Sequence, residues 1–178
     1  MNFRLLLIFI LMLVFWSCHR RLGDLANDQK LRVLAIDKII ENQSLLRLDS
    51  SVYALKKTDT LTAYKDDHKQ IIRFMRSLSS TASFQTINLY FEKGELVSSL
   101  HKEINQARIK NQTEITRKQY YFQNGSVIYA EMRSVHSARL SNEQLLHKLN
   151  LTKPRPFKHS PYIYRDEIIF FEKNKNNF

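Results

Sequence analysis

The sequence is poor in three residue types that define large classes of protein. Its 178 residues include 3 Gly, 3 Pro and 1 Cys. A single cysteine excludes an internal disulfide framework, so a folded domain must rest on its apolar core. Three glycines exclude a P-loop or a dinucleotide-binding turn, because both need several residues without a Cβ. The composition, 43% hydrophobic and 25% charged, is typical of one globular domain and far from disordered composition.

Motifs of catalysis and metal binding are also missing. No two of the 6 histidines stand three to five residues apart, and neither H-E-x-x-H nor G-x-S-x-G occurs. No group of carboxylates surrounds a glycine as in a calcium loop. Asp66 and Asp67 are interpreted as turn residues, since short carboxylates favour turns. We therefore predict no metal, no cofactor and no catalytic residue, and we expect a protein that is not an enzyme.

The first 18 residues carry the strongest targeting signal. Arg4 precedes an unbroken apolar run over residues 5–16. As a helix this run would span about 18 Å, which is short of the ~30 Å hydrocarbon core of a bilayer. It suits the apolar region of a secretory signal better than a membrane span. The run ends at Ser17 and Cys18, the only cysteine.

A small residue before a cysteine at the end of such a run resembles a bacterial lipobox. The resemblance implies cleavage before Cys18, a diacylglycerol on its thiol and an acyl chain such as palmitate on its new amino group. Phe15 and Trp16 replace the usual leucine and small residue, a variant that occurs in Bacteroidetes-type lipoproteins. Arg20 and Arg21 would add about 1 kcal/mol each of attraction to anionic head groups. The alternatives are an ordinary signal peptide and a short membrane anchor.

The residues after this signal predict a helix. Asn27 and Asp28 would cap a helix over residues 28–47, and Val33, Ile36 and Ile40 would lie on one face of it. The predicted division of the chain is 1–17 signal peptide, 18–27 tether, 28–172 a single α+β domain and 173–178 a frayed tail.

Three segments in the middle of the chain share a hairpin pattern. In each, a tyrosine stands four residues before a turn residue, and an aliphatic residue follows three after it. Asn124-Gly125 is the strongest short hairpin signal, and we expect Gly94 and Gly125 to have positive φ. The tyrosines are Tyr64, Tyr90 and Tyr121, the turn residues His68, Gly94 and Gly125, and the aliphatic residues Ile71, Val97 and Ile128.

Alternation within these segments predicts strands. Ile87 and Leu89 face one way and Asn88 and Tyr90 the other. The three tyrosines of the pattern would share one face, either as cross-strand packing or as the lining of a binding groove. Residues 60–133 are similar to small Bacteroidetes-type lipoproteins with repeated Y-[YF]-x-x-G hairpins, most of which have no known activity.

The C-terminal part predicts a short helix and a strand. Ser141 and Gln144 have the spacing of a capping box, and Leu140 and Leu145 that of a hydrophobic staple. Residues 162–172 are apolar enough to be a final strand. The predicted fold is α+β: an N-terminal helix packed on a curved antiparallel meander sheet of about six to seven strands, plus a short C-terminal helix.

The remaining feature is charge. The formal net charge is +11, and residues 144–165 contain no acid. We expect a lipid-anchored envelope protein, on the outer membrane facing the periplasm, that binds or supports anionic lipid, lipopolysaccharide or an envelope protein rather than nucleic acid. Alternatives are a basic face that is merely solvated, an enzyme with a cleft between helix and sheet, or an inhibitor or immunity-type protein. The candidate anion-binding residues are Lys148, Lys153, Arg155, Lys158 and Arg165.

Overall fold

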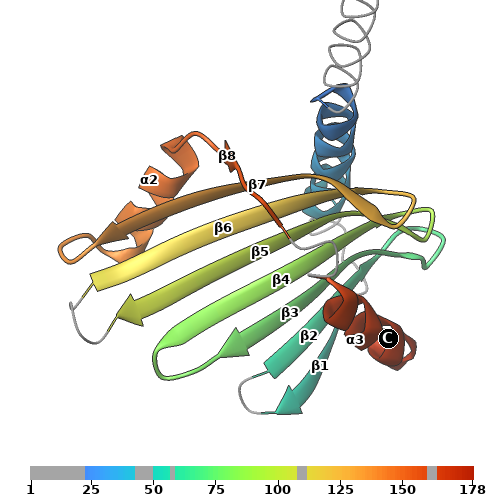
Figure 1. Ribbon diagram of the computed structural model, residues 1–178. Coiled ribbons are helices and arrows are strands. Elements are labelled where there is room, and N and C mark those ends of the chain that lie inside the picture. The colour runs from blue at the N-terminus through green and yellow to red at the C-terminus, as the bar shows by residue number, and fades with distance from the viewer. Residues whose placement is uncertain (1–22, 43–49, 57–58, 108–111, 160–163) are drawn as a thin grey trace, which may run out of the picture.

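The computed structural model describes residues 23–42, 50–56, 59–107, 112–159 and 164–178. Cys18 and the predicted signal peptide lie outside these residues. Strands β1 to β8 follow one another in a single antiparallel sheet, each paired with the next (Figure 1). The strands are β1 (Ser50–Lys56), β2 (Asp59–Lys65), β3 (Ile71–Ser79), β4 (Ser83–Glu92), β5 (Glu95–Ala107), β6 (Gln112–Gln123), β7 (Ser126–Ser137) and the two-residue β8 (Arg155–Pro156).

This architecture confirms the predicted fold class: a helix precedes an open antiparallel meander of seven long strands, and a short helix follows it. β1 was not predicted, because the polar residues 49–51 favour a break in the chain, whereas Ser50 already pairs with Tyr64 of β2. In the described part of the chain, no helix is both long enough and apolar enough to cross a membrane.

The hairpin turns lie where the tyrosine pattern predicts them. Gly94 and Gly125 have φ of 81° and 73°, which confirms the prediction for both. Lys93 and Asn124 before them also have positive φ, so each turn has two central residues in the left-handed region, as tight hairpins require. In the β2–β3 turn the positive φ falls on Lys69, at 61°, and not on His68 as the pattern predicts.

That first turn is longer because a side chain organises it. The Asp66 carboxylate accepts hydrogen bonds from the backbone N–H of His68 at 3.0 Å and of Gln70 at 2.8 Å. The peptide N–H of Lys69 also donates to the Asp66 carbonyl. Asp66 is therefore a turn residue, as the sequence predicts.

The register of all three hairpins shifts by one residue at the same place. The shift follows Tyr64, Tyr90 and Tyr121, and the extra residue lies on the returning strand each time. Such a bulge changes which side chains share a face. The shifts align one row across six strands, in which each residue lies opposite the next: Tyr64, Arg73, Tyr90, Ser98, Tyr121 and Tyr129.

The N-terminal helix, described over residues 23–42, packs on this row (Figure 1). Its Val33, Ile36 and Ile40 are buried in one cluster with Tyr90 and with Val97, the extra residue of the second bulge. The predicted helical face is therefore correct, and the tyrosines act as cross-strand packing. The predicted tether is wrong for residues 23–27, which already belong to the helix.

Two cations fix the helix on the tyrosine row. Arg73 lies 4.7 Å from the ring centre of Tyr64 and forms an ion pair with Asp37 of the helix at 3.2 Å. Lys30 of the helix lies 5.6 Å from the ring centre of Tyr121 and 3.0 Å from the Glu131 carboxylate. Cation–π contacts of this kind contribute about 0.5–1 kcal/mol each at partly exposed sites.

The opposite face of the sheet is covered by α3 (Arg165–Asn174), where the sequence predicted a strand. An apolar run of four residues suits either element. Helical spacing brings Ile168 and Phe171 onto the sheet, while Asp166 and Lys173 complement the dipole at the two helix ends. The ring of Phe171 stacks on that of Phe91 at 4.5 Å between centroids.

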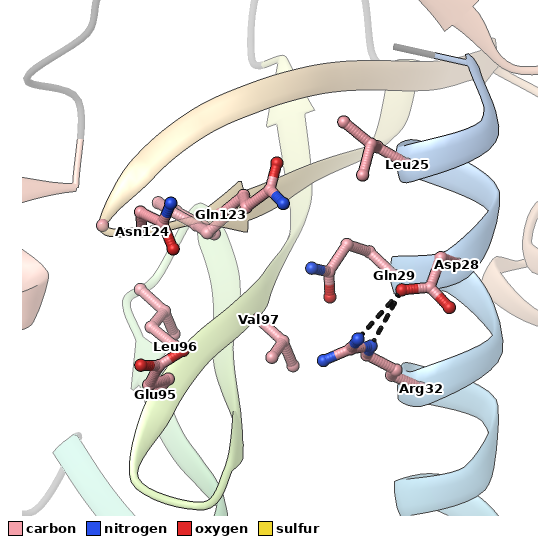
Figure 2. A pocket seen from close by; sticks show the side chains of 11 residues that line it. Leu25, Asp28, Gln29, Arg32, Glu95, Leu96, Val97, Gln123 and Asn124 are labelled. Carbon is pink, nitrogen blue, oxygen red and sulfur yellow. Dashed lines mark hydrogen bonds and ion pairs between the residues drawn. The ribbon is translucent and has the colours of Figure 1, made fainter. Parts of the chain in front are cut away.

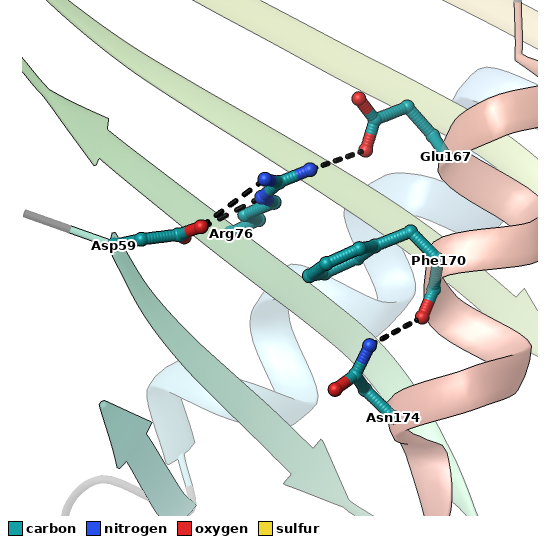
Figure 3. A network of polar contacts seen from close by, with 5 residues as sticks. All are labelled: Asp59, Arg76, Glu167, Phe170 and Asn174. Carbon is teal, nitrogen blue, oxygen red and sulfur yellow. Dashed lines mark hydrogen bonds and ion pairs between the residues drawn. The ribbon is translucent and has the colours of Figure 1, made fainter. Parts of the chain in front are cut away.

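A polar network adds to this docking. Arg76 of β3 binds Asp59 at 3.1 Å and Glu167 of α3 at 3.7 Å, and its guanidinium lies 3.9 Å from the ring centre of Phe170 (Figure 3). The tail is not frayed as predicted: Lys175–Asn177 form a 3-10 turn, and the Phe178 ring lies 5.8 Å from that of Phe74.

Helix α2 (Asn142–Leu151) forms as its sequence predicts. The Ser141 side chain accepts from the Gln144 N–H, and the Gln144 side chain accepts from the Ser141 N–H, which completes the capping box. Leu145 and Leu149 pack on Ile115 and Val135, at the end of the sheet away from the tight hairpin turns.

Candidate anion-binding site

The N-terminal helix and α2 pack on two separate clusters on one face of the sheet, and alternate residues of β5 lie in and between these clusters. We call the stretch of this face between the two clusters the gap. Leu100 packs against the cluster of the N-terminal helix, and Ile104 packs against the cluster of α2. Lys102 stands between them on the same face of the strand, since side chains two apart point the same way.

Three cations line up across this gap. Lys102 lies directly opposite Arg117 of β6, and Arg117 lies directly opposite Arg133 of β7. All three are half-buried. Residues directly opposite have Cβ atoms about 5 Å apart, and like charges in such pairs destabilise a sheet. We call Lys102, Arg117 and Arg133 the cation ladder.

No carboxylate of the described residues neutralises the centre of the ladder. Neither Lys102 nor Arg117 has an ion-pair partner among the described residues. The nearby carboxylates on this face bind other cations: Glu131 binds Lys30, and Asp37 binds Arg73. Burial, and then the positive charge of Arg117, lower the pKa of Lys102. A bound anion would relieve both the repulsion and the lost hydration of these cations.

Arg133 joins the ladder to α2. Its Nη1 donates to the backbone carbonyl of Asn150 at 3.2 Å, close to the C-terminal end of the helix. Carbonyls at a helix C-terminus attract cations, so this contact holds the guanidinium at the edge of the gap. Lys148, in the last turn of α2, lies two residues away along the chain.

The five predicted anion-binding residues are distributed over three elements and the segments that connect them. All are exposed, and none forms an ion pair with a described carboxylate. Lys148 is on α2, Lys153 and Lys158 flank β8, Arg155 is in β8, and Arg165 begins α3. Arg155 lies opposite Met132, which points to the other face of the sheet from Arg133 of the ladder. Arg165 belongs to the helix on the other face and stands apart.

A separate hollow of about 410 Å³ lies between the N-terminal helix and the tips of two hairpins (Figure 2). One wall is a single stripe of the helix, and the other consists of the β4–β5 and β6–β7 turns. Asp28 and Glu92 both bind Arg32 at its rim, at 3.0 and 2.6 Å. Its lining is Leu25, Asp28, Gln29, Arg32, Glu95, Leu96, Val97, Phe122, Gln123, Asn124 and Gly125.

Comparisons with known proteins yield no relative: no family of protein sequences, no curated protein and no solved structure matches this chain. Within the described ranges, no three His, Cys, Asp or Glu side chains come together as metal ligands.

Sequence reasoning missed the cation ladder. Counting back from the Asn124-Gly125 turn without a bulge pairs Arg117 with Met132, and leaves Arg133 on the opposite face. The shift after Tyr121 moves Arg133 opposite Arg117. The available signal is the repeated tyrosine pattern itself, because the same shift accompanies it in all three hairpins.

Proposed function

We propose that this chain is a lipid-anchored protein of the bacterial envelope that binds phosphate-bearing anionic lipid through the cation ladder. The cleavage and acylation signal at Cys18 supports the anchor. A protein held by its own acyl chains is confined to the membrane surface, so even a weak site for an anionic head group would be occupied there.

The observation that carries this proposal is the ladder. Three half-buried cations lie in register across three strands, and Lys102 and Arg117 have no ion-pair partner among the described residues. Such an arrangement costs stability unless an anion lies on it. Guanidinium groups bind phosphate with two parallel hydrogen bonds, which suits Arg117 and Arg133. The exposed Lys148 adds positive charge on α2, the helix whose Asn150 carbonyl binds Arg133.

Titration with short-chain lipids tests the proposal. The full chain, in a nonionic detergent, is titrated calorimetrically with dihexanoyl phosphatidylglycerol, dihexanoyl phosphatidylcholine and inorganic phosphate. We expect binding of the glycerol lipid, weaker binding of free phosphate and none of the zwitterionic choline lipid. The affinity should fall as salt rises, because the contact is ionic.

Two matched variants locate the site. Arg117→Gln should weaken binding about tenfold, since a hydrogen bond to a charged group contributes about 1.5–3 kcal/mol. Lys118→Gln removes the same charge from the next residue, which lies on the opposite face across from His101 and Met132, and should leave the affinity unchanged. Equal binding by the parent and Arg117→Gln would contradict the proposal.

A further inference from the structure

The hollow between the N-terminal helix and the hairpin tips has a surplus of carboxylates, whereas the cation ladder has a surplus of positive charge. We propose that the hollow binds a small aliphatic amine in its protonated form, independently of the phosphate site.

The central observation is Gln29. Its side chain leaves the helix and points into the space in front of the hairpin tips (Figure 2). The residue is only 5% exposed, and its Oε1 is buried without a hydrogen-bond partner among the described residues. A buried acceptor left unpaired lowers the stability of the fold. A ligand that donates an N–H to this oxygen would recover that loss.

The charge around the hollow selects a cation. Asp28 and Glu95 line it, and Glu92 lies at its rim through the ion pair with Arg32. Among the described residues that line it, Arg32 is the only cation. Three carboxylates therefore face one guanidinium, which is already bound to Asp28 and Glu92. The region is locally negative in a chain whose formal net charge is +11.

The remaining lining sets the size and polarity of the ligand. Leu25 and Val97 supply apolar walls, which suit a short hydrocarbon chain rather than a fully polar molecule. A volume of about 410 Å³ lies within the range of small-molecule sites. An ammonium group of the ligand would donate to Gln29 or to Glu95, and its methylene groups would lie between these two residues. An aliphatic monoamine or diamine fits this description.

Calorimetric titration of the full chain in nonionic detergent tests this inference, with 1,4-diaminobutane as the probe. 1,4-Butanediol is the control of equal length without charge. We expect the diamine to bind and the diol not to bind. No heat of binding from the diamine, or equal binding of the diol, would overturn the inference.

Variants then assign the binding to this hollow. Gln29→Leu should weaken the diamine about tenfold or more, yet should not lower the melting temperature, because it removes an unpaired buried polar atom. Gln119→Leu is the matched control: Gln119 is also buried, at 8% exposed, but its amide donates to Ser98 Oγ and it lies outside the hollow. It should lose stability and keep its affinity.

Glu95→Gln provides a second test at an exposed position, where a substitution should change stability too little to unfold the protein. It should also weaken the diamine while leaving the affinity for dihexanoyl phosphatidylglycerol unchanged. Parent-like diamine affinity in both Gln29→Leu and Glu95→Gln would overturn the inference.

Discussion

Removing the central charge of the ladder should make the protein more stable. Arg117 faces Lys102 on one side and Arg133 on the other. Each directly opposed pair of like charges costs about 0.2–1 kcal/mol. If each of the two pairs costs about 0.5 kcal/mol, the free energy of unfolding of Arg117→Gln should exceed that of the parent by about 1 kcal/mol at low ionic strength. For a domain of this size that gain raises the melting temperature by roughly 2–4 °C.

Thermal unfolding followed by circular dichroism measures this shift. The gain should shrink near 1 M salt, where the Debye length of about 3 Å is shorter than the spacing of the charges. Lys118→Gln, which has no cation directly opposite, should show no gain. Saturating dihexanoyl phosphatidylglycerol should stabilise the parent more than Arg117→Gln. A variant that melts with the parent or below it at low salt would refute the argument that the ladder is unneutralised.

Three other variants test the fold. In Gly125→Val the free energy of unfolding by denaturant should fall by more than about 1 kcal/mol. The cause is the φ of 73°, which strains a branched residue, and not a clash, because the space around Gly125 is open. Unfolding like that of the parent would mean that the turn is assigned wrongly. In Phe171→Ala the free energy of unfolding should fall by about 3–5 kcal/mol, because the buried ring that stacks on Phe91 is removed. A fall below about 1 kcal/mol would mean that α3 does not pack on this face of the sheet. Burial lowers the pKa of His101, so the unfolded chain takes up the proton first as pH falls through about 6.5. Melting temperatures of His101→Leu should therefore fall less than those of the parent between about pH 7.5 and 5, and parallel pH profiles would contradict a buried neutral imidazole.

Local signals in the sequence were sufficient for the elements whose ends they mark. The Asn124-Gly125 turn and the capping box from Ser141 to Gln144 both form as predicted, because each depends on residues within one turn of backbone. The row of tyrosines was also predictable, since alternation and the hairpin spacing agree on the face that each tyrosine occupies.

The C-terminal segment and the ladder depend on longer-range packing. The apolar run around Phe171 suits a strand or a helix, and contact with the sheet decides between them. Arg133 meets Arg117 only because the bulge after Tyr121 shifts β7 by one residue, and a one-residue shift moves every later side chain to the other face. Of the candidate residues predicted from the basic segment, Lys148 lies on α2, which contacts the ladder through Arg133, whereas Arg155 and Arg165 lie toward the other face of the sheet.

The central proposal is that the protein is tethered to a membrane by acyl chains and binds anionic lipid there. Fatty-acid labelling tests the tether most directly. The parent and Cys18→Ala are expressed with labelled palmitate in a Gram-negative host, and both are fractionated. We expect label and membrane association in the parent and the loss of both in Cys18→Ala. A parent that is never labelled and is recovered as a soluble secreted chain would contradict it.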